Sequence, residues 1–116
     1  MREIVRLARD AGAKKVFVAS TSPRVMFPNF YGIDMPTRDE LICGHGMDAE
    51  GVAQQLKADC VVYQTKESML AALHDLNPSI ENFECSCFDG IYITGGIDED
   101  YIVKQENKRK AELKTA

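Results

Sequence analysis

The fold is decided by two stretches of sequence, Val16-Phe17-Val18-Ala19 and Cys60-Val61-Val62-Tyr63. Each stretch is apolar throughout, whereas a strand with one solvated face alternates apolar and polar side chains. Continuous apolar runs of this length are typical of parallel strands that are covered on both faces. The sequence therefore predicts two parallel strands, each buried on both sides.

Helices are expected between and after these strands. Thr37, followed by Glu40, matches a capping box, so a helix is expected to begin at residue 38. Asp48 is a suitable N-cap for a second helix, and Thr65 for a third one that stops before Pro78. The alternation of strands with helices is that of βαβ units and predicts an α/β sheet.

The two ends of the chain suggest a piece of a larger sheet. An apolar stripe predicts a helix over residues 2–11, closed by Gly12, but no capping residue precedes it. Residues 90–96 form a possible third strand ending in a glycine turn, and residues 98–116 are expected to be a charged helix or tail. A sheet of only two or three parallel strands cannot bury both of its faces well. The expected architecture is therefore part of a doubly wound sheet with flanking helices.

Composition excludes several classes of protein. The chain has 116 residues, 45% of them hydrophobic and 28% charged, with a net charge of −4. Nucleic-acid-binding proteins usually carry a basic surface, so nucleic acid is not an expected partner. No run is long enough to span a membrane, and no signal peptide is visible, so a cytoplasmic location with four free thiols is expected.

The best candidate site is the polar turn Ser20-Thr21-Ser22-Pro23-Arg24 after the first strand. Ligands of open α/β sheets bind at the carboxyl ends of the strands, where the second strand contributes Gln64 and Thr65. Hydroxyl and N–H groups there could hold a phosphate or ribose oxygen, although a simple polar turn explains them equally well. A response-regulator phosphorylation site is excluded, because no Asp stands at either strand end.

Other motifs carry weaker signals. Thr94-Gly95-Gly96 lacks the Gly-Lys-Ser/Thr ending of a nucleotide P-loop and is interpreted as a turn. Cys85 and Cys87 are spaced too closely for a usual zinc site, and their role is left open between a metal and small buried groups on one side of an extended segment. Cys43 with His45 and the acidic residues 98–100 are weak candidates for a nucleophile pair and a Mg²⁺ site.

Three longer stretches resemble a known family. They are Gly12 to Ser20 leading to Pro23, then Phe27-Pro28-Asn29-Phe30-Tyr31-Gly32-Ile33-Asp34-Met35-Pro36-Thr37, and finally Phe83 to Thr94. In this order and spacing they are similar to the C-terminal part of glutamine phosphoribosylpyrophosphate amidotransferase, or amidophosphoribosyltransferase. The resemblance covers nearly the whole chain, and it implies the type I phosphoribosyltransferase fold.

The resemblance implies a reaction of purine synthesis. The family releases ammonia from glutamine and uses it to displace pyrophosphate from phosphoribosyl pyrophosphate, giving phosphoribosylamine, with Mg²⁺ on the leaving group. This chain lacks the nucleophilic N-terminal Cys, and the acidic pair and phosphate loop of the family would lie before Met1. The isolated chain is therefore expected to be an inactive fragment, without the Mg²⁺ ligands.

The resemblance also implies roles for individual residues. The turn Ser20–Arg24 would form the rim that faces phosphoribosyl pyrophosphate or a purine nucleotide, and Tyr31, Asp34 and Pro36 would support it. An iron–sulfur cluster, which some members hold, is not expected here, because the spacing is Cys-x-Cys. Residues 1–97 would belong to the phosphoribosyltransferase domain, and 98–116 would be its charged tail.

Two alternatives to a piece of an enzyme stay open: a nucleotide-phosphate-binding module without catalysis, and a structural module. If the chain is instead a piece of the enzyme, apolar sheet surface left uncovered where the missing strands pack would favour self-association.

Overall fold

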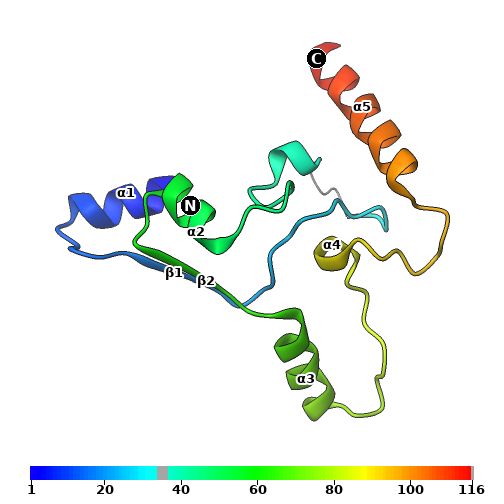
Figure 1. The fold of residues 1–116 in the computed structure, drawn as a ribbon, viewed down its shortest axis with the longest axis horizontal. Coiled ribbons are helices and arrows are strands. Elements are labelled where there is room, and N and C mark those ends of the chain that lie inside the picture. The colour runs from blue at the N-terminus through cyan, green and yellow to red at the C-terminus, as the bar shows by residue number, and fades with distance from the viewer. Residues whose placement is uncertain (34–36, 116) are drawn as a thin grey trace. The chain divides into compact units, whose positions relative to one another are not determined.

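The computed structural model describes residues 1–33 and 37–115, and the chain divides into two compact units (Figure 1). Unit 1 is Met1–Arg24 with Gly46–Glu81, and unit 2 is Val25–His45 with Asn82–Ala116. The elements in order are α1 (Arg2–Asp10), β1 (Phe17–Ser20), η1 (Arg38–Glu40), α2 (Ala49–Leu56), β2 (Cys60–Tyr63), α3 (Lys66–Leu76), α4 (Ser86–Asp89) and α5 (Glu99–Thr115). Within the described residues, no helix has both the length and the apolar character that a membrane span requires.

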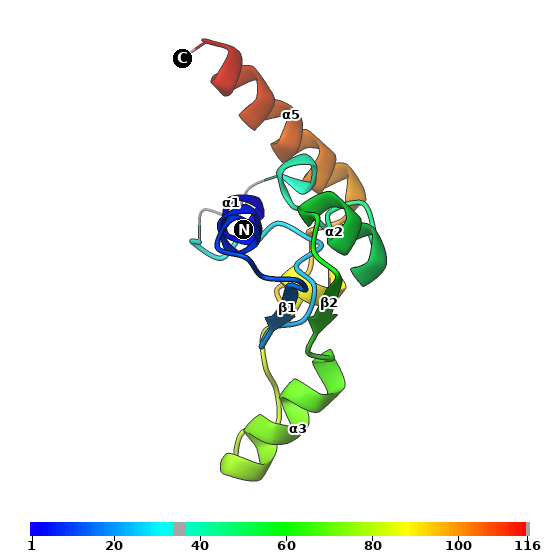
Figure 2. The ribbon, with the colours of Figure 1, turned by 90° about the vertical axis from the view of Figure 1, so that its left-hand side faces the viewer.

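Unit 1 contains the predicted pair of parallel strands. β1 and β2 lie side by side in both views, with Phe17 opposite Cys60 and Ser20 opposite Tyr63 (Figures 1 and 2). Backbone bonds extend the pairing at both ends, from the Asp59 N–H to the Val16 carbonyl and from the Gln64 N–H to the Ser20 carbonyl. The prediction of an α/β fold with parallel strands is thus confirmed.

The predicted burial of both strands on both faces is wrong for this chain. Val61 is buried, but Phe17 is 66% exposed and Val62 is 56% exposed. The helix α2 packs on β2, but in the described residues the strand pair has no third strand beside it. The apolar run was correctly identified as a parallel strand, but its burial depends on elements that must pack against it from elsewhere.

Local capping explains where the helices of unit 1 begin. The Asp48 carboxylate accepts a hydrogen bond of 2.8 Å from the Gly51 N–H, and the Thr65 hydroxyl accepts one of 3.1 Å from the Ser68 N–H. Both predicted N-caps are confirmed. The inner face of α2 is buried as predicted (Val52, Ala53, Leu56), whereas α3 has no buried residue.

A carboxylate ties α1 to the start of both strands. The Asp59 Oδ2 atom accepts hydrogen bonds of 2.7 Å from the Val16 N–H and 2.7 Å from the guanidinium of Arg9. Arg9 lies in the last turn of α1, and Gly12, just beyond the helix, has a φ of +97°. The predicted helix and its glycine ending are therefore confirmed, and Asp59 links them to β1 and β2.

In unit 2 the helix predicted from residue 38 is only the short 3₁₀ turn η1. The capping box between Thr37 and Glu40 is present, as expected. The chain then turns back on itself, because a Cβ atom at Gly44 would lie 1.9 Å from the carbonyl oxygen of Arg38. η1 ends at Glu40 because the next residue, Leu41, has an extended backbone with φ −83° and ψ 130°.

The predicted third strand over residues 90–96 is also wrong. Gly90, Gly95 and Gly96 all have positive φ angles, and the Gly95 N–H bonds to the Tyr92 carbonyl in a turn. The turn closed by this bond occupies residues 92–95, so it replaces most of the predicted strand. The glycine turn itself is confirmed, but Ile93 is 72% exposed and has no neighbouring strand in the described residues.

Aromatic side chains form the core of unit 2. The buried hydroxyl of Tyr92 donates a hydrogen bond of 2.7 Å to the Pro28 carbonyl. The ring of Phe30 lies 5.5 Å from that of Tyr92 and 5.4 Å from that of Tyr101, between centroids. Tyr101 comes from α5, so the charged segment from residue 98 onward is an ordered helix that packs on this core.

Candidate functional site

The predicted rim, Ser20–Arg24, follows β1 directly and is an ordered turn. The Ser20 hydroxyl donates to the Ser22 carbonyl at 2.9 Å and accepts from the Ser22 N–H at 3.2 Å. The Ser22 hydroxyl donates to the Pro23 carbonyl at 3.0 Å. Both serine protons are therefore used inside the turn, and they fix its shape rather than facing a ligand.

Two other groups of the rim are better placed to meet a ligand. Thr21 is exposed at the tip of the turn. The half-buried Arg24 donates from Nη1 to the Met47 carbonyl at 2.9 Å, which holds its guanidinium against the segment before α2. A hydroxyl and a cation at the carboxyl end of a parallel strand suit an anionic ligand.

The residues expected to support the rim are only partly described. The Tyr31 hydroxyl lies 3.1 Å from the Thr94 hydroxyl, and it accepts a hydrogen bond of 3.3 Å from the Thr94 N–H. Tyr31 belongs to unit 2, whereas the rim belongs to unit 1. Asp34 and Pro36 lie outside the described residues, so the supporting role of this loop stays a prediction.

The cysteines lie in different surroundings. The pair expected on one side of an extended segment is instead helical, because Cys85 is the N-cap of α4 and Cys87 lies within it. Burial raises the pKa of the Cys87 thiol, and the nearby Glu84 adds to this effect, so the reactive thiolate is disfavoured. Cys43 is buried, whereas its predicted partner His45 is exposed and bonds to Asp39 at 2.8 Å.

No metal centre is found in residues 1–33 and 37–115, where no group of three or more His, Cys, Asp or Glu side chains could hold an ion. The acidic residues 98–100 serve the helix start instead. The Asp98 carboxylate accepts from the Tyr101 N–H at 2.9 Å, and Glu99 bonds to the Arg38 guanidinium at 2.7 Å. These carboxylates therefore have helix-capping and ion-pairing roles.

Sequence reasoning missed an ionic cluster around Arg38. Its guanidinium binds Glu106 through two parallel bonds of 3.0 Å, and its backbone N–H donates to the same carboxylate at 2.9 Å. The two side chains are only 17% and 12% exposed. This arrangement holds the pKa of Glu106 below its ordinary value, chiefly through the hydrogen bonds from the Arg38 guanidinium. Because 68 residues separate the pair in sequence, no local pattern could reveal it.

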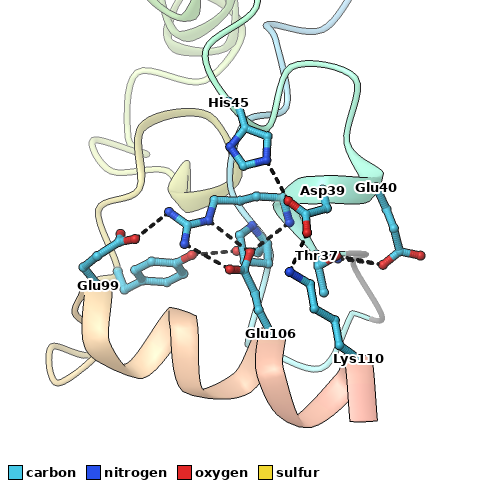
Figure 3. Close-up of polar contacts among 10 residues, drawn as sticks. Thr37, Asp39, Glu40, His45, Glu99, Glu106 and Lys110 are labelled. Carbon is cyan, nitrogen blue, oxygen red and sulfur yellow. Dashed lines mark hydrogen bonds and ion pairs between the residues drawn. The ribbon is translucent and has the colours of Figure 1, made fainter. Parts of the chain in front are cut away.

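A second set of charges continues the cluster along α5. Figure 3 shows Glu99, Glu106 and Lys110 projecting from the helix toward the turn that carries Asp39. The ammonium of Lys110 lies 2.5 Å from the Asp39 carboxylate, and this contact keeps the pKa of Asp39 below its ordinary value. The cluster is a fixed set of matched charges, so its evident role is to hold η1 and α5 together.

Each unit also has a surface hollow. In unit 1 a hollow of about 590 Å³ lies between α1 and the end of α2. In unit 2 a hollow of about 240 Å³ lies between residues 28–33, Thr37 and α5. Neither of these two hollows is lined by the rim Ser20–Arg24.

Comparison with known proteins gives the relationships of the chain. No family model matches it. It is 42% identical to an amidophosphoribosyltransferase of Pasteurella multocida over an alignment 116 positions long, which covers 95% of this chain and 23% of the relative. It is 44% identical to that of Escherichia coli over 100 residues, 86% of this chain and 20% of the relative.

The fold agrees with the sequence comparison. A solved structure of glutamine phosphoribosylpyrophosphate amidotransferase from B. subtilis, complexed with ADP and GMP, superposes with a TM-score of 0.67. It is 32% identical, and the match covers 84% of this chain and 22% of that one. With this fold and these identities, the chain is homologous to a part of the amidophosphoribosyltransferases, and it spans about a fifth of the length of the relatives it matches.

Proposed function

We propose that residues 1–116 are part of the phosphoribosyltransferase domain of an enzyme that makes phosphoribosylamine from phosphoribosyl pyrophosphate and glutamine-derived ammonia. The observation that carries this proposal is 42% identity over 95% of the chain to an amidophosphoribosyltransferase. Because the chain spans only 23% of that relative, it contributes to the reaction without performing it alone. A cytoplasmic location and the division into residues 1–97 and 98–116 stay predictions.

Within this function, the rim Ser20–Arg24 contacts the phosphate of phosphoribosyl pyrophosphate or of a purine nucleotide. Three observations support this role: the rim ends a parallel strand, it exposes Thr21, and it orders the cation of Arg24. The B. subtilis structure was solved with ADP and GMP, which contain the same kind of phosphate. Both Thr21 and Arg24 donate hydrogen bonds, as a phosphate acceptor requires.

In this proposal, the metal ions of the reaction would be bound by other parts of the enzyme. Residues 1–33 and 37–115 contain no cluster of side chains that fits Mg²⁺, so no step is assigned to a metal here. The Mg²⁺ that neutralises the pyrophosphate leaving group would be held by residues outside this chain. The absence of an iron–sulfur cluster stays a prediction.

A chimera tests the enzymatic part of the proposal. In it, this chain replaces the matching segment of the Escherichia coli relative, and phosphoribosylamine formation is measured with ammonia, phosphoribosyl pyrophosphate and Mg²⁺. We expect activity from the chimera and none from the 116-residue chain alone. A chimera with native circular dichroism but no activity would contradict the proposal, as would turnover by the isolated chain.

Nucleotide titration separates the enzyme from the alternative, a binding module without catalysis. Calorimetry with AMP, GMP and phosphoribosyl pyrophosphate is run on the 116-residue chain and on Arg24→Met. Losing one charge-assisted contact is expected to weaken binding by about tenfold. Arg2→Met, at an exposed cation of α1, is the control and should leave binding unchanged. Binding by the chain together with an inactive chimera would favour the alternative, whereas no binding at all would contradict the assignment of the rim.

We also propose that the uncovered sheet surface of unit 1 mediates self-association of the isolated chain. Phe17 and Val62 are more than half exposed, and the outer edges of the β1–β2 pair offer unpaired backbone groups. Light scattering on a concentration series should show mass above 12.9 kDa for the chain and lower association for Phe17→Lys. A monomer at every concentration would contradict this part.

A further inference from the structure

The helix α5 meets the η1 turn along one charged face. Glu99, Ile102, Glu106 and Lys110 follow one another at intervals of three or four residues, which places them on one side of the helix. Glu99 and Glu106 bind Arg38, and Lys110 binds Asp39, in the turn Arg38–Glu40. The face that docks is thus defined mainly by ion pairs.

The apolar contact in this docking is confined to a narrow strip of α5. Ile102 is 4% exposed, and Tyr101 touches Phe30 with the edge of its ring. Val103, on the next position of the helix, is 40% exposed, and Tyr101 itself is 37% exposed. A helix held by so narrow an apolar strip can slide or rotate unless another interaction fixes its position.

The order of the charged side chains along α5 fixes the position of the helix. Moving α5 by one turn in one direction would bring Glu106 to the place of Lys110, opposite Asp39. Moving it by one turn in the other direction would bring Lys110 to the place of Glu106, opposite Arg38. Both displacements set like charges against each other, which disfavours them.

Arg38 makes the most contacts in this arrangement. Its guanidinium donates to Glu99 and, through two bonds, to Glu106, and its backbone N–H donates to Glu106 as well. A planar guanidinium bound by two parallel bonds fixes distance and orientation together. Its side chain is 17% exposed, so solvent screens this pair less than the exposed pairs of the cluster.

We propose that α5 acts as a strap, by which we mean a helix that ion pairs hold in one register on the η1 turn. Arg38 sets this register through Glu106 and Glu99. Residues 98–116 are then a structural part of unit 2, and Arg38 is the positioning residue that links them to the 25–45 segment. Salt acts mainly on the Lys110–Asp39 pair of the strap, because these two side chains are 46% and 51% exposed. This inference is independent of the reaction proposed above.

Hydrogen exchange on the 116-residue chain tests the strap. In Arg38→Met, the α5 amides should exchange about tenfold faster, whereas the amides of β1 and β2 keep their rates. Arg2→Met, which removes an exposed cation from α1, is the matched control and should leave both sets unchanged. Unchanged α5 exchange in Arg38→Met would overturn the proposal.

A second variant, in which the two charges are exchanged, tests the proposal even if Arg38→Met disturbs the whole of unit 2. The double variant Arg38→Glu with Glu106→Arg restores the pair with reversed signs, and it should recover part of the lost α5 protection relative to each single variant. Raising NaCl from about 0.05 to about 0.5 M should speed α5 exchange in the native chain more than in Lys110→Met, which lacks the exposed pair with Asp39. Failure of the double variant to recover protection, or equal salt effects in the native chain and Lys110→Met, would also overturn the proposal.

Discussion

Unit 1 and unit 2 are stabilised in different ways. Unit 1 is built from helices and a parallel strand pair whose caps and backbone bonds join residues close in sequence or in register. Unit 2 has no strand in its described residues, and it depends on long-range contacts such as Tyr92 with Pro28 and Arg38 with Glu106. The comparison shows that one short chain combines a locally specified unit with one that is specified by distant side-chain pairs.

The largest effect is expected in the core of unit 1. Leu56 on the inner face of α2 is 7% exposed, so Leu56→Ala should lower the free energy of unfolding of unit 1 by about 2–5 kcal/mol. Urea denaturation followed by circular dichroism measures the change. The exposed neighbour Gln55→Ala is the control and should have little effect. Equal effects of the two variants would show that α2 does not form the core of unit 1.

The second largest effect is expected in unit 2 when the pH is raised. Burial raises the pKa of Tyr92 to about 12, from an ordinary value of 10.0. The folded state therefore favours the neutral phenol, and this contribution is complete below pH 10 and is lost as the pH rises from 10 toward 12. Exchange or near-ultraviolet circular dichroism of the aromatic cluster should change in this window. In Tyr92→Phe the same window should be flat, and a remaining transition of equal size would assign it to another group.

A smaller effect is expected at the link between α1 and the strands. Asp59→Asn weakens the bonds that Oδ2 accepts from the Val16 N–H and from Arg9. Because the Asp59 side chain is 32% exposed and solvent screens its charge, we expect only a small loss of stability. Thermal unfolding should show the loss. It should shrink in an Arg9→Met background, because the two residues share one interaction. Full additivity of the two substitutions would contradict the link.

The smallest effect is expected at a helix cap. Thr65→Ala removes the acceptor for the Ser68 N–H, and α3 should lose about 0.5–1 kcal/mol of local stability. The exchange rates of the first α3 amides measure this, whereas α5 in unit 2 should not respond. Thr65→Ser keeps the hydroxyl and is the matched control. A similar loss in Thr65→Ser would mean that the methyl group, rather than the cap, stabilises the start of α3.

Sequence reasoning found most of unit 1 and little of unit 2. The strands, the caps at Asp48 and Thr65, and the inner face of α2 were all predicted, because each leaves a recognisable pattern in consecutive residues, although β1 and β2 pair across distant positions such as Phe17 and Cys60. The strand expected over residues 90–96 does not form, since a turn closed by the Gly95 N–H and the Tyr92 carbonyl occupies it and no partner strand lies beside it in the described residues. The rim was predicted as a polar turn, but its internal serine bonds required coordinates.

The sequence by itself determined the parallel strand pair, the helix starts and the relationship to amidophosphoribosyltransferases, because periodicity, capping residues and shared motifs are all written in consecutive positions. Only the tertiary structure decided that Arg38 would bind Glu106, that Phe17 would be exposed, and that the charged segment from residue 98 would pack as a helix. The physical reason is that burial and ion pairing depend on which distant surfaces meet. Capping residues and hydrophobic periodicity contain no information about which distant surfaces come into contact.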